Sequence, residues 1–212
     1  MNNKSTIMSL LAGLAILVCL PEMGHAQIGG IPLWNEPSDP GGVEIAGDVG
    51  FDSDEDVNMY AGRVQAGLGP LALGATIGVR DLEDPVDIES YGATAALRLI
   101  VGGLNPLALN LQAGYGADDI DTPDETRFSA AVGLSIVPPD LGFRLEPWIS
   151  PGARMIRTRV NGEWVDGDTR FALAGGVRAT FGLLGLHVGA DHVDKGDTSY
   201  GVGLHLRLGP PL

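Results

Sequence analysis

Cysteine is almost absent from this sequence, since Cys19 is the single one among 212 residues. It lies in an apolar N-terminal run that we expect to be removed, which leaves the rest of the chain without a thiol or a disulfide. Lysine is nearly as rare, because only Lys195 lies beyond residue 4. An exported domain of this size without disulfides must be stabilised by its own hydrogen-bond ladders and packed side chains.

A positive charge balance is also lacking. The chain has 13 Lys and Arg against 27 Asp and Glu, for a formal net charge of -14. Nucleic-acid binding needs Lys and Arg on the phosphates, so the composition argues against a nucleic-acid partner. Long apolar runs are missing after residue 20, and no later stretch approaches the ~20 apolar residues of a membrane-spanning helix.

The single long apolar run, residues 7–20, follows Lys4 and ends at Pro21. Gly24 and Ala26 then place small residues at the two positions that a signal peptidase reads. We predict a secretory signal peptide over residues 1–26. The alternative, an anchor that is never cleaved, is disfavoured because the run is too short to span a bilayer as a helix.

From residue 43 onward, apolar residues alternate with small or polar ones. The clearest unit covers residues 71–104, where two alternating runs flank an acidic loop. A period of two is typical of β-strands with one apolar face and one small or polar face. In the first run the apolar face holds Leu71, Leu73, Ala75, Ile77 and Val79, and the other face holds Ala72, Gly74, Thr76, Gly78 and Arg80.

The same pattern predicts ten strands. Short Gly/Pro turns follow the even-numbered strands and longer acidic loops follow the odd ones, as in outer-membrane barrels, and most strands have the ~9–11 residues of a tilted membrane strand. We predict an all-β fold: an antiparallel up-and-down transmembrane β-barrel of ten strands, with eight as the alternative, over residues 43–212, preceded by a periplasmic N-terminal segment over residues 27–42. The predicted strands are residues 43–51, 58–68, 71–80, 91–101, 107–117, 128–136, 143–158, 171–181, 184–193 and 200–208.

Each even-numbered strand begins with an aromatic residue on its apolar face, directly after its loop. Such residues at one height around a barrel form the aromatic girdle of a membrane interface. In three of these strands an Arg follows seven positions later, and the odd spacing directs it to the opposite, inner face. The aromatic residues are Tyr60, Tyr91, Phe128, Phe171 and Tyr200, and the arginines are Arg98, Arg178 and Arg207.

The Y-G-x-x-x-x-L-R-L units at Tyr91 and Tyr200, with the final stretch TSYGVGLHLRLGPPL, resemble the small, porin-like outer-membrane β-barrel family of the OmpA-transmembrane, OmpX and opacity type. The resemblance covers residues 43–212. It implies the outer membrane of a didermic bacterium and insertion by the barrel assembly machinery. Members of that family usually end on an aromatic residue, whereas this chain ends on Leu212 after two prolines.

A soluble β-protein would also alternate, but here the polar faces carry Gly, Ala, Thr, Ser and Arg, and the aromatic residues sit at strand ends. The seventh strand fits the pattern least well, because Pro147 and Pro151 remove ladder donors. These prolines favour a bulge that resets the alternation. Without such a bulge Trp148 points inward, where it would constrict a pore.

Charged residues on the inner faces are the main candidate site. An unpaired charge inside a barrel is costly, so we expect an ion-pair network that closes the lumen and holds the strand register. The alternative is a narrow, arginine-lined pathway for small anions. The predicted lumen residues are Arg63, Arg80, Arg98, Arg144, Arg178, Arg207, Glu44, Asp48, Glu146, His187 and His205.

The two inner histidines are predicted to face each other, because a hairpin centred near residue 196 would set His187 directly opposite His205. A third metal ligand beside them is not evident, and packing within the polar lumen is the favoured interpretation. We also expect no catalysis. The best catalytic candidates, Asp191 and His192, are adjacent in a strand and must point to opposite faces.

A calcium site is the other metal hypothesis. Asp52, Asp54 and Asp56 imitate the start of an EF-hand loop, but Val57 replaces the turn glycine and Arg63 stands where the bidentate Glu belongs. These three aspartates are therefore weak candidates only. We predict no resident metal and no cofactor.

Function follows from these features as an expectation. We expect a structural or surface barrel with a charge-plugged lumen and acidic external loops, with Asp118 in the third loop and Asp191 in or beside the fifth. A narrow passive channel for small solutes is the alternative, and an outer-membrane hydrolase is less favoured. The expected partners are outer-membrane lipid and lipopolysaccharide, with divalent cations as one means of bridging carboxylates to phosphates. We expect a monomer.

Overall fold

The computed structural model describes residues 42–52, 58–81, 88–100, 106–118, 125–138, 142–160, 162–194 and 198–209. The predicted signal peptide and most of the predicted N-terminal segment lie outside these residues and stay predictions. No helix long and apolar enough to cross a membrane occurs in the described part of the chain. The strands are β1 Gly42–Asp52, β2 Asn58–Leu68, β3 Leu71–Asp81, β4 Ile88–Ile100, β5 Leu107–Asp118, β6 Glu125–Ile136, β7 Arg144–Val160, β8 Glu163–Asp166, β9 Arg170–Phe181, β10 Leu184–Val193 and β11 Thr198–Leu208.

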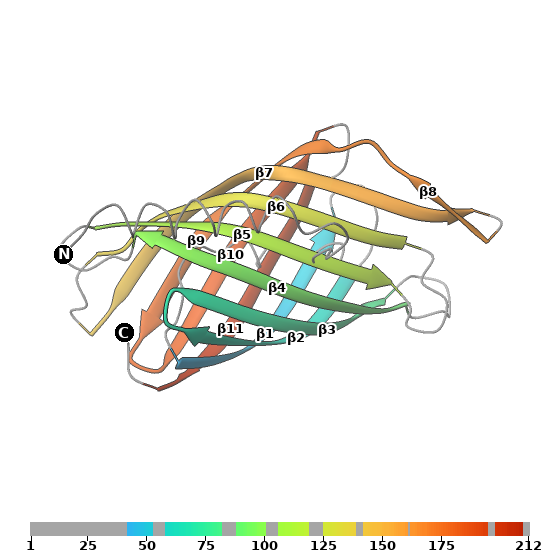
Figure 1. Cartoon of the computed structure of the whole chain (residues 1–212). Coiled ribbons are helices and arrows are strands. Elements are labelled where there is room, and N and C mark those ends of the chain that lie inside the picture. Colours follow the sequence, from blue (N-terminus) through green and yellow to red (C-terminus); the bar gives the residue numbers. More distant parts are fainter. Residues whose placement is uncertain are drawn as a thin grey trace, which may run out of the picture.

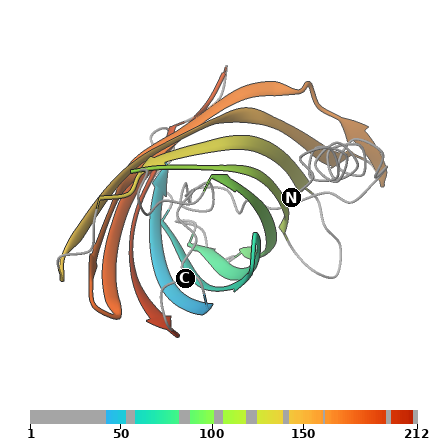
Figure 2. The ribbon, with the colours of Figure 1, turned by 60° about the vertical axis from the view of Figure 1, so that its left-hand side comes forward.

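The strands form one antiparallel sheet that closes on itself (Figure 1). β7 pairs with β6 on one side and with β9 on the other, while β1 pairs with both β2 and β11. Ten strands therefore complete the ring, and β8 is a short branch that pairs only with β7. Figure 2 shows the sheet curving round on itself. The prediction of ten strands rather than eight is confirmed.

The barrel is inside-out compared with a soluble protein. Large apolar side chains on the outer face are exposed, with Ile77 at 57% and Leu204 at 67%. On the inner face Arg178 is fully buried and Glu146 is 1% exposed. The cause is the alternation itself, since successive residues of a strand point to opposite faces. The described interior is consequently rich in charged and polar groups rather than in leucine and valine.

Aromatic residues mark both ends of the outer face. Tyr115 and Phe128 meet edge-to-face, with ring centroids 5.7 Å apart, at the end of the barrel where β1, β3, β5 and β7 finish. Phe143 and Phe181 lie 4.7 Å apart at the opposite end. Amphipathic or aromatic rings at two levels, with aliphatic residues between them, are typical of a barrel surface that meets lipid.

Two of the short turns are tight hairpins with glycine at the first position. Gly69 and Pro70 join β2 to β3, and Gly182 and Leu183 join β9 to β10. Gly69 has φ +68° and Gly182 has φ +60°. A two-residue turn of this kind requires a left-handed first residue, which glycine adopts without a Cβ clash.

The structure of β7 contradicts the bulge that we expected in the seventh strand. Its register against β6 is the same before and after Pro151, and its pairing with β9 runs without a shift from Arg144 to Arg154. The prolines therefore produce no bulge, because their missing donors only interrupt the β6 ladder between Gly152 and Ile149. Trp148 consequently stays on the inner face and is 5% exposed.

The strand also continues further than predicted. β7 runs to Val160 and pairs with β8, which was not predicted. β8 has only four residues, EWVD. It begins and ends with an acidic residue and is flanked by Gly162 and Gly167, a composition typical of a loop. A four-residue strand is too short to show a period of two clearly.

Candidate functional site

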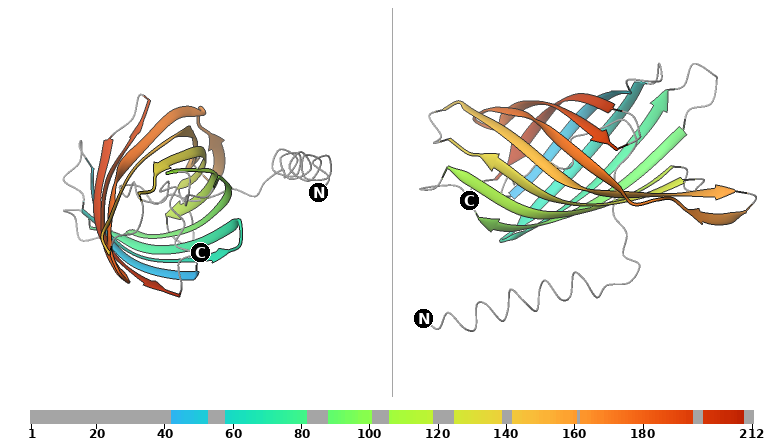
Figure 3. Two further views of the ribbon diagram at one scale, coloured as in Figure 1. Left: turned by 90° about the vertical axis from the view of Figure 1, so that its left-hand side faces the viewer. Right: turned by 90° about the horizontal axis from the view of Figure 1, so that it is seen from above.

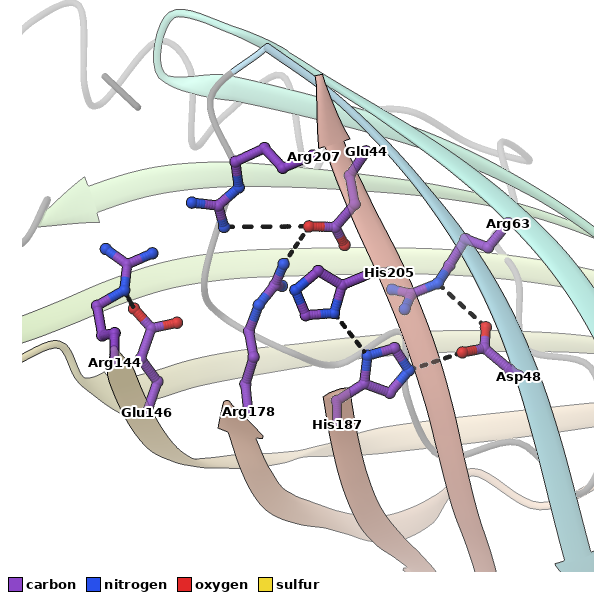
Figure 4. Close-up of polar contacts among 9 residues, drawn as sticks. All are labelled: Glu44, Asp48, Arg63, Arg144, Glu146, Arg178, His187, His205 and Arg207. Atoms are coloured by element: carbon purple, nitrogen blue, oxygen red, sulfur yellow. Dashed lines mark hydrogen bonds and ion pairs between the residues drawn. The ribbon is translucent and has the colours of Figure 1, made fainter. Parts of the chain in front are cut away.

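The predicted lumen residues separate into a central group and a periphery. Arg80 and Arg98 stand apart: Arg80 contacts Asp118 near the other rim, and Arg98 donates through Nη2 to the carbonyl of Gly69 in a turn. The remaining nine form what we call the lumen cluster (Figure 4). Its members are Glu44, Asp48, Arg63, Arg144, Glu146, Arg178, His187, His205 and Arg207.

Glu44 anchors one half of the lumen cluster. Its carboxylate forms an ion pair with Arg178, although β1 and β9 are separated in the ring by two other strands. Arg207, opposite Glu44 in the β1–β11 register, approaches the same oxygen at 4.0 Å. All three side chains are at most 6% exposed. A buried carboxylate with two guanidinium groups beside it is compensated electrostatically, as an interior charge must be.

Arg178 connects this carboxylate to the next one. Glu146 lies opposite Arg178 in the β7–β9 register, and Arg144 contacts Glu146 with 2.8 Å between Nε and Oε1. Charges of opposite sign thus alternate across the lumen from Arg207 to Arg144 (Figure 4). Removal of a single member would leave its neighbour as an uncompensated charge inside the ring.

Asp48 anchors the other half. Its Oδ2 forms an ion pair with Arg63, with 3.3 Å between Oδ2 and Nε. Its Oδ1 lies 2.7 Å from Nε2 of His187. The Nδ1 atoms of His187 and His205 are 3.1 Å apart, and the two rings stack with an interplanar angle of 4°. These contacts are all satisfied when His187 donates from Nε2 to Asp48 and accepts at Nδ1 from His205.

The prediction that His187 lies directly opposite His205 in the strand register is wrong. His187 lies opposite Gly203, and His205 lies opposite Gly185, so the imidazoles meet diagonally. A Cβ on either glycine would overlap an imidazole ring. The predicted hairpin centre was one residue too late, which displaces the register by two. A displacement by two keeps every side chain on its own face, so both histidines still point inward.

A second set of interior charges, which sequence reasoning missed, lies toward the opposite rim. Asp118 accepts from Arg127 at 2.8 Å and from Ser90 at 2.7 Å, and Arg154 forms an ion pair with Asp191. Asp118 and Asp191 are 8% and 4% exposed, so assigning Asp118 to an external loop was wrong, and Asp191 faces the interior from within its predicted strand. The alternation in β5, β6 and β10 continues through these residues and would have indicated their inward direction.

The metal and catalytic candidates gain no support. Asp191 and His192 point to opposite faces, with Asp191 buried and His192 exposed at 3.0 Å from the Thr198 hydroxyl. Among the described residues, no three His, Cys, Asp or Glu side chains are grouped as metal ligands. Asp54 and Asp56 lie outside the described part of the chain, and Asp52 ends β1.

Comparison with known proteins finds likeness at the level of fold. No family model matches the chain, and no curated protein matches it. Among solved structures, a de novo designed transmembrane β-barrel shares 16% sequence identity, and the match covers 81% of this chain and 99% of the designed chain, with a TM-score of 0.39. The KdgM porin shares 8% sequence identity, and the match covers 78% of this chain and 99% of the porin chain, with a TM-score of 0.42. LpxR from Salmonella typhimurium also shares 8% over 78% and 99%, with a TM-score of 0.44. The likeness is one of fold alone.

Proposed function

We propose that this protein is an integral outer-membrane β-barrel with a structural or surface role, whose lumen is closed by the lumen cluster. The observation that carries the proposal is the inversion of the two faces. Exposed leucine, isoleucine and valine cover the outside, while paired charges fill the inside. In water such an exterior would aggregate, whereas in lipid it is the required surface.

Strand length supports a membrane-spanning orientation. An eleven-residue strand such as β2 is about 36 Å long at ~3.3 Å per residue. At a tilt of about 40° it spans about 28 Å, close to the ~25 Å apolar band of outer-membrane barrels. The closed ring also pairs every strand on both sides, as the absence of water in a bilayer core demands.

We propose that the short-turn end faces the periplasm and that the opposite end, where β1, β3, β5, β7 and β10 finish, faces outward. The interactions expected from this placement are contact with outer-membrane lipid, insertion by the barrel assembly machinery, and a monomeric state. The proposed role is not enzymatic, and it needs no cofactor.

A folded barrel in detergent extracts is the first expected result. We expect the unboiled protein to migrate differently from the boiled protein on a denaturing gel, because closed barrels resist detergent until heated. We also expect the protein in the outer-membrane fraction of the expressing cells. A protein that is freely dissolved without detergent and shows one mobility would contradict the proposal.

Closure of the lumen gives the second expected result. We expect the wild-type protein in planar bilayers to show no steady single-channel steps, because Glu44, Arg178 and Arg207 meet across the lumen. The double variant Glu44→Ser with Arg178→Ser removes one acid and one base, and we expect it to introduce steps. Arg98→Ser is the control, since Arg98 lies outside the lumen cluster. Steady steps from the wild-type protein would refute the closed lumen.

A narrow passive channel is the second candidate function, favoured by one observation. Several inner-face positions of β3, β4 and β6 hold small neutral residues that are half-buried, although Ala72, Thr76 and Ser135 on the same faces are buried. Arginines elsewhere in the interior would then favour small anions. The half-buried inner residues include Gly74, Thr94, Ala96 and Ala131. The conductance experiment decides between the two candidates.

A further inference from the structure

The β7–β8 hairpin is the part of the barrel that projects beyond its neighbours (Figure 3). β7 has 17 residues, against 10 to 13 for the other strands of the ring. β8 pairs with the last four residues of β7, so that Arg159 lies opposite Trp164 and Arg157 lies opposite Asp166. The projection lies at the end that we propose to face outward.

The outward face of this hairpin continues the lipid-facing surface. Glu146 and Trp148 point inward, so the odd-numbered residues of β7 point outward, Met155, Arg157 and Arg159 among them. Met155 lies opposite Phe128, at the level of the aromatic residues near the outer rim. The two arginines therefore follow directly above the apolar band on the same face.

Their height coincides with the headgroup layer. Two residues advance about 6.6 Å along a strand, which is about 5 Å along the membrane normal at a tilt of about 40°. The headgroup region on each side of a bilayer is about 5–8 Å thick. Arg157 then lies about 5 Å above Met155, inside this layer, and Arg159 lies about 10 Å above Met155, just beyond the outer margin of the layer.

The side chains suit a phosphate at an interface. Arg157 lies over the Trp164 ring with its Cζ 5.9 Å from the centroid, and the indole is 40% exposed. Arg159 is exposed and lies 3.3 Å from the Gly162 carbonyl through Nε. Indole is amphipathic and favours the interface, while guanidinium groups bind phosphate through paired hydrogen bonds.

This pair also differs from the other arginines of the described chain. Arg63, Arg80, Arg127, Arg178 and the remaining ones lie on inner faces of their strands, whereas Arg157 and Arg159 point outward. The chain as a whole carries a net charge of -14, which would repel anionic lipid elsewhere. Asp166 lies opposite Arg157 in the register, so this face of the hairpin carries two arginines, one acid and one tryptophan. The net positive charge at headgroup height is complementary to a phosphorylated lipid.

We propose that Arg157, Arg159 and Trp164 form a site for the phosphate of an outer-leaflet lipid headgroup, bound directly and without a bridging cation. The site rests on the proposed outer-membrane function and names where that lipid is held. It differs from the sequence-based expectation, in which loop carboxylates reach phosphates through divalent cations.

Lipid binding to the detergent-solubilised full chain tests the site. Native mass spectrometry would follow titration with lipid A, with phosphatidylcholine as the lipid that lacks net negative charge and inorganic phosphate as the free anion. We expect Arg157→Gln and Arg159→Gln each to weaken lipid A binding about tenfold, the loss of one charge-assisted contact. Arg170→Gln, an equal charge change on an inner-face position at the same end, is the matched control and should stay within about twofold.

Each outcome has a defined meaning. Wild-type affinity in both variants, or an equal loss in Arg170→Gln, would overturn the site. Equal affinity for phosphatidylcholine, whose phosphate is neutralised by its choline, would overturn recognition of an anionic lipid phosphate, and equal affinity for inorganic phosphate would overturn a lipid as the ligand. Gel mobility of every variant with and without boiling shows whether the barrel is folded. A wild-type protein that fails this folding test refutes the outer-membrane proposal itself, and the site with it.

Discussion

Substitution of Arg178 by methionine is expected to lower the free energy of unfolding by about 3–5 kcal/mol, the usual cost of removing one partner from a buried charge pair. Arg178 is fully buried, pairs with Glu44 across the lumen and lies opposite Glu146 in the β7–β9 register. Methionine keeps much of the volume but leaves Glu44 with Arg207 alone, at 4.0 Å. Urea unfolding in phospholipid vesicles, followed by gel mobility, measures the loss.

Two further variants separate charge compensation from packing at this position. Arg98→Met makes the same change at an inner-face arginine that lies outside the lumen cluster and donates to the Gly69 carbonyl, and it should cost less than about 1 kcal/mol. The double variant Glu44→Gln with Arg178→Met removes both charges and should recover part of the stability, because no buried carboxylate is then left with a single distant partner. Equal stability of Arg178→Met and Arg98→Met would show that the lumen cluster contributes little to the fold.

A valine at Gly203 is expected to destabilise the barrel by about 3 kcal/mol, the upper end of the range for overpacking an interior. A Cβ there would overlap Asp48 Oδ1 and His187 Nε2 and would lie 2.8 Å from the Gly47 carbonyl oxygen. The substitution therefore pushes Asp48 and His187 apart and strains the β1–β11 ladder. Valine favours strands, so backbone propensity cannot explain a loss.

Gly62→Val is the matched control for this variant. Gly62 lies in β2 on the outer face, and a Cβ there meets nothing within 4 Å. The extra apolar surface would face lipid, so its unfolding midpoint in urea should match or exceed that of the wild-type protein. If Gly203→Val is as stable as Gly62→Val, the contact of Asp48 with His187 across Gly203 is not a packed element of the lumen.

The strand count and the two faces of each strand could be predicted because both depend on local sequence. Ile77 and Arg178 lie on the predicted sides of the wall, since a period of two is a property of the extended backbone. The short turns could also be predicted from the sequence, because Gly69 and Gly182 provide the left-handed residue that two-residue hairpins require. Strand register was predicted less accurately, since the hairpin between β10 and β11 is centred one residue earlier than predicted.

The residues of this chain therefore determine by themselves that it forms alternating strands with an apolar outside and a charged inside. The tertiary structure decided which charges meet. Glu44 pairs with Arg178, although two other strands lie between β1 and β9, and the continuation of β7 carries Arg157 and Arg159 past the start of β9. The physical reason is that side-chain direction depends on neighbouring residues, whereas contact across a lumen depends on strand tilt, stagger and closure of the whole ring.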